Sequence, residues 1–202
     1  MRRPKINRSE PRAAAYLNLP RVCGVGGILG GALFVVWGYI DTPGVSGSSE
    51  LTVRLLSFVV PTMFLAAVVG LFVLWRNEPA MLLRMGMVLA AYGWGWAVAV
   101  AIVGDEVMWA FLAQRGWPHH LTDWLWFMLT GLTLVGIATA RRGPSRGGAL
   151  VLATGAFGWV YYLTDSAAVL EARSVHVCFG LAFSLGWVLL GLGLLGAGRR
   201  RA

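Results

Sequence analysis

The sequence predicts an all-α protein, a polytopic membrane helical bundle in which six transmembrane helices form three tandem, like-oriented hairpins. Of the 202 residues, 57% are hydrophobic and 13% are charged, whereas a soluble domain carries about 25% charged residues. The mean hydropathy is +0.68. Six apolar segments are near the length of about 20 residues that a helix needs to cross a bilayer. These segments are 21–40, 55–75, 81–103, 122–140, 147–164 and 174–197.

A repeat supports the division into hairpins. An aspartate closes each odd-numbered segment, at Asp41, Asp105 and Asp165, and their spacing of about 60 residues indicates tandem copies of one unit. Arginines close the even-numbered segments in the same way. One transmembrane domain, 21–198, is therefore expected, and no separate soluble domain. Its hairpins are placed at about 21–76, 81–141 and 147–198.

Both ends of the chain are basic. Residues 1–20 carry several arginines and three prolines, and 199–202 form a basic tail. The first helix is too long for a cleavable signal peptide and lacks a small-residue cleavage pattern, so we expect a signal anchor. Of the 17 Lys and Arg residues, only Arg54, Arg115 and Arg173 are assigned to the side opposite the two ends. Because Lys and Arg are retained in the cytoplasm, both termini are predicted to be cytoplasmic. The basic excess thus reports orientation and affinity for lipid headgroups, and it does not indicate a nucleic-acid partner.

The first helix, 21–40, is rich in glycine, with Gly26-x-x-x-Gly30 and Gly27-x-x-x-Gly31. Lipid gives no hydrophobic reward for helix association, so small residues that let backbones approach closely must supply the contact. These glycines are expected either to pack within the bundle or to form a dimer face. Two aromatic residues near the outer end of this helix fit the aromatic belt of a membrane protein: Trp37 and Tyr39.

The second helix, 55–75, contains Pro61, which removes one backbone hydrogen bond and is expected to kink the helix. The hydroxyls of Ser57 and Thr62 are expected to satisfy the freed carbonyl. A kink of this kind borders a cavity in some membrane proteins and is structural in most.

The third helix carries Tyr92-Gly93-Trp94-Gly95-Trp96. Helical geometry places Tyr92 and Trp96 on one face and Trp94 elsewhere. An indole N–H at mid-depth needs a hydrogen-bond partner. The rings therefore either fill space beside the glycines or line a pocket for a flat or isoprenoid ligand. The candidate ligand-binding residues are Tyr92, Trp96, Trp159 and Tyr162.

The third outer loop is the longest. Residues 106–115 are expected to form a short helix in the membrane interface, and Gly116-Trp117-Pro118 ends it. Thr122 is then expected to cap the fourth helix, with Asp123 favourable in its first turn.

Two local patterns resemble a known group of proteins. One is the Gly136-Ile137-Ala138-Thr139-Ala140-Arg141 ending, followed by a short basic Gly-Pro turn and a new apolar segment. The other is Pro61 in the second helix, with Gly70-Leu71 near its inner end. In these features the chain resembles a diffuse set of bacterial six-helix integral membrane proteins with no established activity. The resemblance implies topology along most of the chain and implies no reaction.

Nearly all ionisable residues that are not assigned to the cytoplasmic side are predicted to lie together at the outer face of the membrane. They are expected either to form exposed ion pairs, which stabilise by about 0–1 kcal/mol each, or to act as acids and bases. In an enzyme the catalytic candidates would be Asp105, Asp123, Asp165, His120 and His176. His119, His120 and Asp123 also offer ligands to a metal, but they lack the i, i+4 histidine pair that fixes a zinc site on a helix. The sequence therefore predicts no metal and no cofactor.

The sequence contains neither Gly-x-Ser-x-Gly nor Gly-x-x-x-x-Gly-Lys. No carboxylate or lysine lies in the middle of a predicted span, where an ion pathway would need one. We therefore expect a non-enzymatic protein of the bacterial inner membrane, either an accessory subunit or a binder of a lipophilic molecule. A small membrane-embedded enzyme acting on a lipid or isoprenoid at the outer leaflet is one alternative, and a facilitative transporter is another. The expected partners are membrane lipids and either a membrane protein or a second copy, bound through the glycine-rich first or sixth helix.

Overall fold

The computed structural model describes residues 10–40, 50–75, 77, 81–115, 124–140, 146–166 and 173–199. Within these ranges the chain is all-helical, with seven helices and no strand, so the predicted fold class is confirmed at that level. Three helices are long and apolar enough to cross a membrane, over Leu19–Trp37, Leu51–Trp75 and Met81–Val103. The helices are α1 (Glu10–Ile40), α2 (Glu50–Trp75), α3 (Met81–Val103), α4 (Asp105–Gln114), α5 (Trp124–Ala140), α6 (Arg146–Ser166) and α7 (Arg173–Arg199).

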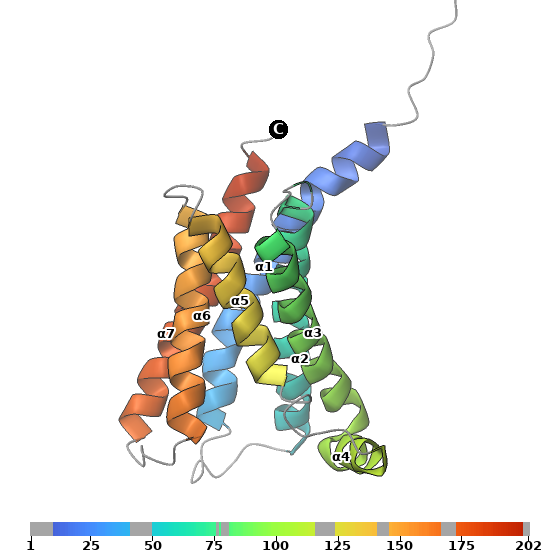
Figure 1. Cartoon of the computed structure of the whole chain (residues 1–202), viewed down its shortest axis with the longest axis vertical. Coiled ribbons are helices and arrows are strands. Elements are labelled where there is room, and N and C mark those ends of the chain that lie inside the picture. The colour runs from blue at the N-terminus through green and yellow to red at the C-terminus, as the bar shows by residue number, and fades with distance from the viewer. Residues whose placement is uncertain are drawn as a thin grey trace, which may run out of the picture.

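The six long helices form a closed ring. Each packs against its neighbour in the order α1, α2, α3, α5, α6, α7, and α7 packs in turn against α1. α1 begins and α7 ends at the same end of the bundle, whereas α4 lies at the other end (Figure 1). The apolar stretches described in α5, α6 and α7 are shorter than those of the first three helices, at Leu125–Ala138, Ala149–Val160 and Gly180–Gly196.

Two helices begin earlier than the sequence indicates. α1 begins at Glu10, inside the basic segment 1–20 that precedes the predicted first span, and it continues through Pro20. The run Arg12-Ala13-Ala14-Ala15-Tyr16-Leu17 explains the extension, because alanine, leucine and arginine are among the best helix formers. α2 begins at Glu50 instead of residue 55.

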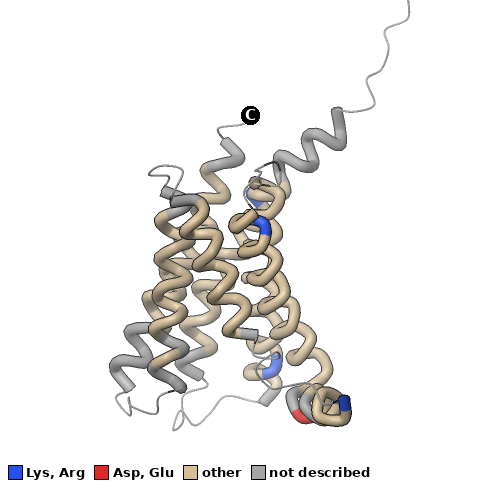
Figure 2. The backbone as a smooth tube through the Cα atoms, viewed as in Figure 1, with Lys and Arg blue, Asp and Glu red and all other residues tan. Residues whose placement is uncertain are grey.

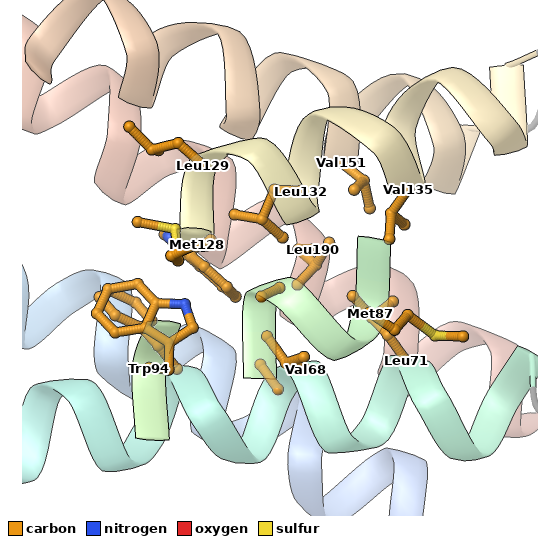
Figure 3. Close-up of a cluster of buried hydrophobic side chains, with 14 of the residues drawn as sticks. Val68, Leu71, Met87, Trp94, Met128, Leu129, Leu132, Val135, Val151 and Leu190 are labelled. Atoms are coloured by element: carbon orange, nitrogen blue, oxygen red, sulfur yellow. The ribbon is translucent and has the colours of Figure 1, made fainter. Parts of the chain in front are cut away.

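The interior is apolar and contributed by every long helix. In Figure 3 Met128 and Leu129 of α5 lie on the side of Trp94 of α3, and further along the same cluster Leu71 of α2 lies beside Met87 of α3. The outer faces are also apolar, with exposed large side chains such as Val22, Val88 and Leu185. Figure 2 shows described charged residues near the two ends of the bundle. An apolar outer surface with charges near its two ends is compatible with a protein surrounded by lipid.

Close backbone approach holds the ring together, as helix packing in lipid requires. A methyl carbon added to Gly86 of α3 would lie 2.7 Å from the carbonyl oxygen of Gly131 of α5. On α1 the two glycine pairs face different neighbours within the chain. Gly26 and Gly30 meet Met63 and Phe64 of α2, whereas Gly27 and Gly31 meet Gly191 and Ser184 of α7, and Gly27 also meets Ala67 of α2. In this structure, packing within the bundle therefore uses all four glycines.

Pro61 lies inside α2, as expected, but its neighbours bond differently from the prediction. The carbonyl that Pro61 leaves without its helical donor is that of Ser57, four residues earlier. The Ser57 hydroxyl donates to the Val53 carbonyl at 2.9 Å, and the Thr62 hydroxyl donates to the Phe58 carbonyl at 2.7 Å. Each hydroxyl reaches back to the carbonyl four residues before it, the usual geometry of Ser and Thr in helices, so neither satisfies the freed carbonyl.

A sharp turn separates α3 from α4. Gly104 has a φ of +92°, which L side chains rarely adopt, and its N–H donates to the Val100 carbonyl at 2.8 Å. Its own carbonyl accepts from the Met108 N–H at 3.1 Å. The predicted short helix is therefore present, and it lies across the end of the bundle, seen nearly end-on in Figure 1.

Candidate functional site

The predicted faces of α3 are confirmed. Tyr92 and Trp96 stack on each other, with ring centroids 6.2 Å apart and an interplanar angle of 27°. Trp94, two residues from each, is turned into the core and is buried. Tyr92 keeps 41% of its surface exposed on the outside of the bundle. The i, i+4 spacing in one helix thus creates a pair of aromatic rings at the periphery.

The pair continues across two neighbouring helices. Tyr92 meets Phe127 of α5 edge-to-face at 5.0 Å, and Phe127 meets Trp126 at 5.9 Å. Trp126 in turn meets Trp159 of α6 at 6.1 Å. We call Trp96, Tyr92, Phe127, Trp126 and Trp159 the aromatic row. The structure therefore links three of the four predicted ligand-binding residues through two that the sequence analysis missed.

The two missed residues carried a signal in the sequence. Trp124-Leu125-Trp126-Phe127 places aromatic residues at the start of α5. That position is where a membrane protein concentrates Trp and Tyr. Trp126 is 46% exposed, so it and Tyr92 present rings to the surroundings of the bundle. Such faces can stack on a flat ring or on the branched chain of an isoprenoid.

A second group of aromatic rings fills the interior. Phe64 of α2 lies 4.6 Å from Trp94 and 4.5 Å from Trp187 of α7, and Phe183 completes the contacts at 6.0 Å from Phe64. Phe34 of α1 joins through Phe183 at 5.2 Å. We call these residues, together with Trp37, the aromatic core. They occupy the middle of the ring of helices, where a polar pathway would otherwise run.

Trp37, expected in the outer aromatic belt, packs partly into the bundle. Its ring lies edge-on to Phe34 at 5.9 Å and packs against the buried core. Its indole nitrogen is buried and has no hydrogen-bond partner among the residues that the structure describes. The side chain of Tyr39, the other expected belt residue, lies outside the described residues.

Two further buried polar groups on α7 lack partners. Trp187 is 0% exposed, and within the described part of the chain neither its Nε1 nor the hydroxyl of Ser184, one turn earlier, has a hydrogen-bond partner. A buried unsatisfied donor costs about 1–3 kcal/mol. By contrast, the buried hydroxyl of Thr154 on α6 donates to the Leu150 carbonyl at 2.9 Å. The aromatic core therefore carries an energetic cost that the peripheral row does not share.

The structure does not describe the side chains of the residues that were predicted to form a catalytic or metal site at the outer face. Asp105, Tyr162, Asp165 and His176 belong to helices, but their side chains lie outside the described part of the chain. His119, His120 and Asp123 lie outside it entirely, as do Asp41 and Thr122. The proposed acid–base set, the metal ligands and the aspartate–arginine pairs therefore remain predictions.

Comparison of the chain with family models, with curated proteins and with solved structures gives no match. The function must therefore be argued from the residues and their arrangement.

Proposed function

We propose that this chain is a six-span protein of the bacterial inner membrane, built as three like-oriented hairpins with both termini in the cytoplasm. Three helices have the length and apolarity for a span, and the remaining three long helices pack beside them in one ring. α1 begins and α7 ends at one end of this ring (Figure 1). The basic excess of the sequence supports the cytoplasmic assignment of that end.

Within the membrane, the protein binds a lipophilic molecule and catalyses no reaction. The observation that supports this function is the aromatic row, a connected set of rings partly exposed on the lipid-facing side of α3, α5 and α6. Ligand sites combine apolar and aromatic surface with a few polar groups that orient the guest, and the aromatic row carries such groups in the phenol hydroxyl of Tyr92 and the indole N–H of Trp96. The buried side chains described between the helices are almost all apolar, which favours binding over transport.

Native mass spectrometry of the detergent-purified protein tests this proposal. The wild-type protein should retain an isoprenoid or flat apolar molecule that Trp126→Leu loses. Phe157→Leu is the matched control, because Phe157 is also exposed on the bundle surface but lies outside the aromatic row. Equal retention by both variants, or recovery of bulk phospholipid alone from the wild-type protein, would refute the proposed site.

A role as an accessory subunit is the second candidate, and α7 favours it. Gly193 and Gly196 are exposed, and a methyl group added to either would meet no atom within 4 Å. Small exposed residues allow another helix to approach closely. In a background lacking Cys23 and Cys178, Gly193→Cys should crosslink to a partner or a second copy in native membranes, whereas Val88→Cys should not. Failure of Gly193→Cys to crosslink would count against this candidate.

A further inference from the structure

Only part of the apolar face of α4 is buried, and the rest of it is exposed. Leu112 is buried, and Met108, four residues earlier and so on the same side of the helix, is partly buried. Val107 and Phe111 form the adjacent strip, also four residues apart, and they are 59% and 47% exposed. Side chains with that spacing share one face of a helix. The strip therefore needs an apolar neighbour that the described part of the chain does not supply.

The position of α4 indicates what that neighbour is. α3 is of spanning length, and its last residues, Ile102 and Val103, are apolar and exposed. If α3 crosses the bilayer, lipid chains extend as far as these residues. Gly104 then turns the backbone, so that α4 lies across the bundle end (Figure 1) at the boundary between acyl chains and headgroups. Amphipathic helices with an uncovered apolar strip bind at this depth.

Arg115, directly after the end of α4, places a positive charge beside the exposed strip of Val107 and Phe111. Its guanidinium carbon lies 4.2 Å from the centre of the Phe111 ring, and the side chain is exposed. A guanidinium that stacks on a ring keeps its N–H edge available, and that edge matches the oxygens of a phosphate in two parallel hydrogen bonds. The cation and the apolar strip therefore lie side by side on α4, as the phosphate and the acyl chains do in a phospholipid.

We propose that α4 is a phospholipid-binding element, in which Val107 and Phe111 enter the acyl boundary and Arg115 holds the headgroup phosphate of a lipid in the same leaflet. This inference rests on the proposed membrane location and is independent of the ligand at the aromatic row. The occupant is a phospholipid of the surrounding membrane.

Nitroxide labels in phosphatidylglycerol nanodiscs test the depth of α4, with collision by oxygen and by a water-soluble nickel chelate as readouts. A label at Val107→Cys should be accessible to oxygen and shielded from nickel, whereas one at Ala113→Cys should face water. A label at Val88→Cys, two turns into α3, reports on the span itself. Water exposure at Val107 with a buried label at Val88 would overturn the α4 proposal alone. Water exposure at Val88 would overturn the membrane location as well.

The phosphate contact is tested by native mass spectrometry after release from the same nanodiscs. Arg115→Gln should retain about fivefold less phosphatidylglycerol than the wild-type protein, the factor expected for one basic residue at a membrane surface. Arg54→Gln, which changes an exposed arginine near the start of α2, should retain wild-type levels. Equal loss in both variants would show general charge attraction and overturn the site. Displacement of the lipid by excess inorganic phosphate would overturn its assignment to a phospholipid.

Discussion

Gly24 of α1 and Gly191 of α7 bring the first and last helices of the ring into backbone contact. A methyl carbon on Gly24 would lie 2.7 Å from the Gly191 carbonyl oxygen and 3.1 Å from the Cβ of Leu194. The obstacle includes main-chain atoms, so no side-chain rotation can relieve it. Closure of the ring between the two ends of the chain therefore depends on the absence of a side chain at this position.

Gly24→Ala should destabilise the bundle by about 1–3 kcal/mol, because α1 and α7 must move apart to admit the methyl group. Gly193→Ala is the matched control on α7, since a methyl group there meets nothing within 4 Å. The control should be neutral or slightly stabilising, by up to about 1 kcal/mol of helix propensity. Unfolding in mixed micelles with increasing SDS measures both. Equal stability of the two variants would show that the contact between α1 and α7 is not tight.

The unpaired indole of Trp187 predicts a difference between two substitutions. Trp187→Phe keeps an aromatic ring against Phe64 and removes the buried N–H, which costs about 1–3 kcal/mol when unsatisfied. The lost contacts and the removed cost should nearly cancel, within about 1 kcal/mol. Trp187→Ala leaves a cavity at the centre and should cost about 3–5 kcal/mol. The same SDS titration measures both variants, and a loss for Trp187→Phe as large as that for Trp187→Ala would show that the N–H has a partner.

Gly104→Ala should disturb the junction between α3 and α4. A backbone φ of +92° is unfavourable for alanine by about 1–3 kcal/mol. The strain should lower stability or be relieved by reorientation of α4, seen as a changed spectrum from a nitroxide at position 110. Gly95→Ala on α3 is the control, because its added methyl group meets open space. If Gly104→Ala matches this control in both measurements, the turn does not depend on glycine.

Helical periodicity was sufficient to predict what lies within one helix. The separation of Tyr92 and Trp96 from Trp94 follows from the angle of about 100° between successive residues, whatever surrounds the helix. The short helix after Val103 could be predicted for a similar reason, because its apolar residues and its break at Gly116-Trp117-Pro118 are local. The unusual φ of Gly104 was not evident, because a glycine between an apolar run and an acidic residue is compatible with several turns.

Contacts between helices could not be predicted from one sequence. The glycines of α1 indicate close packing, but their order does not reveal that Gly26 faces α2 and Gly31 faces α7. The place of Trp37 near the end of the first helix does not reveal that its ring packs against the buried core beside Phe34. The aromatic row likewise depends on Trp126 meeting Trp159, which only the arrangement of α5 beside α6 determines.

The proposed orientation makes a sharp prediction for thiol labelling. The turn at Asn77 joins α2 to α3, and α4 follows the opposite end of α3, so an α3 that spans the membrane places Asn77 and Ala113 on different sides. In a background without Cys23 and Cys178, a membrane-impermeant maleimide should label Ala113→Cys on intact cells and Asn77→Cys only after lysis. The buried Cys23, kept as the only thiol, should remain unlabelled in the native protein in either condition. The reverse pattern would place the termini outside the cytoplasm, and labelling of both positions from one side would show that α3 does not cross the membrane.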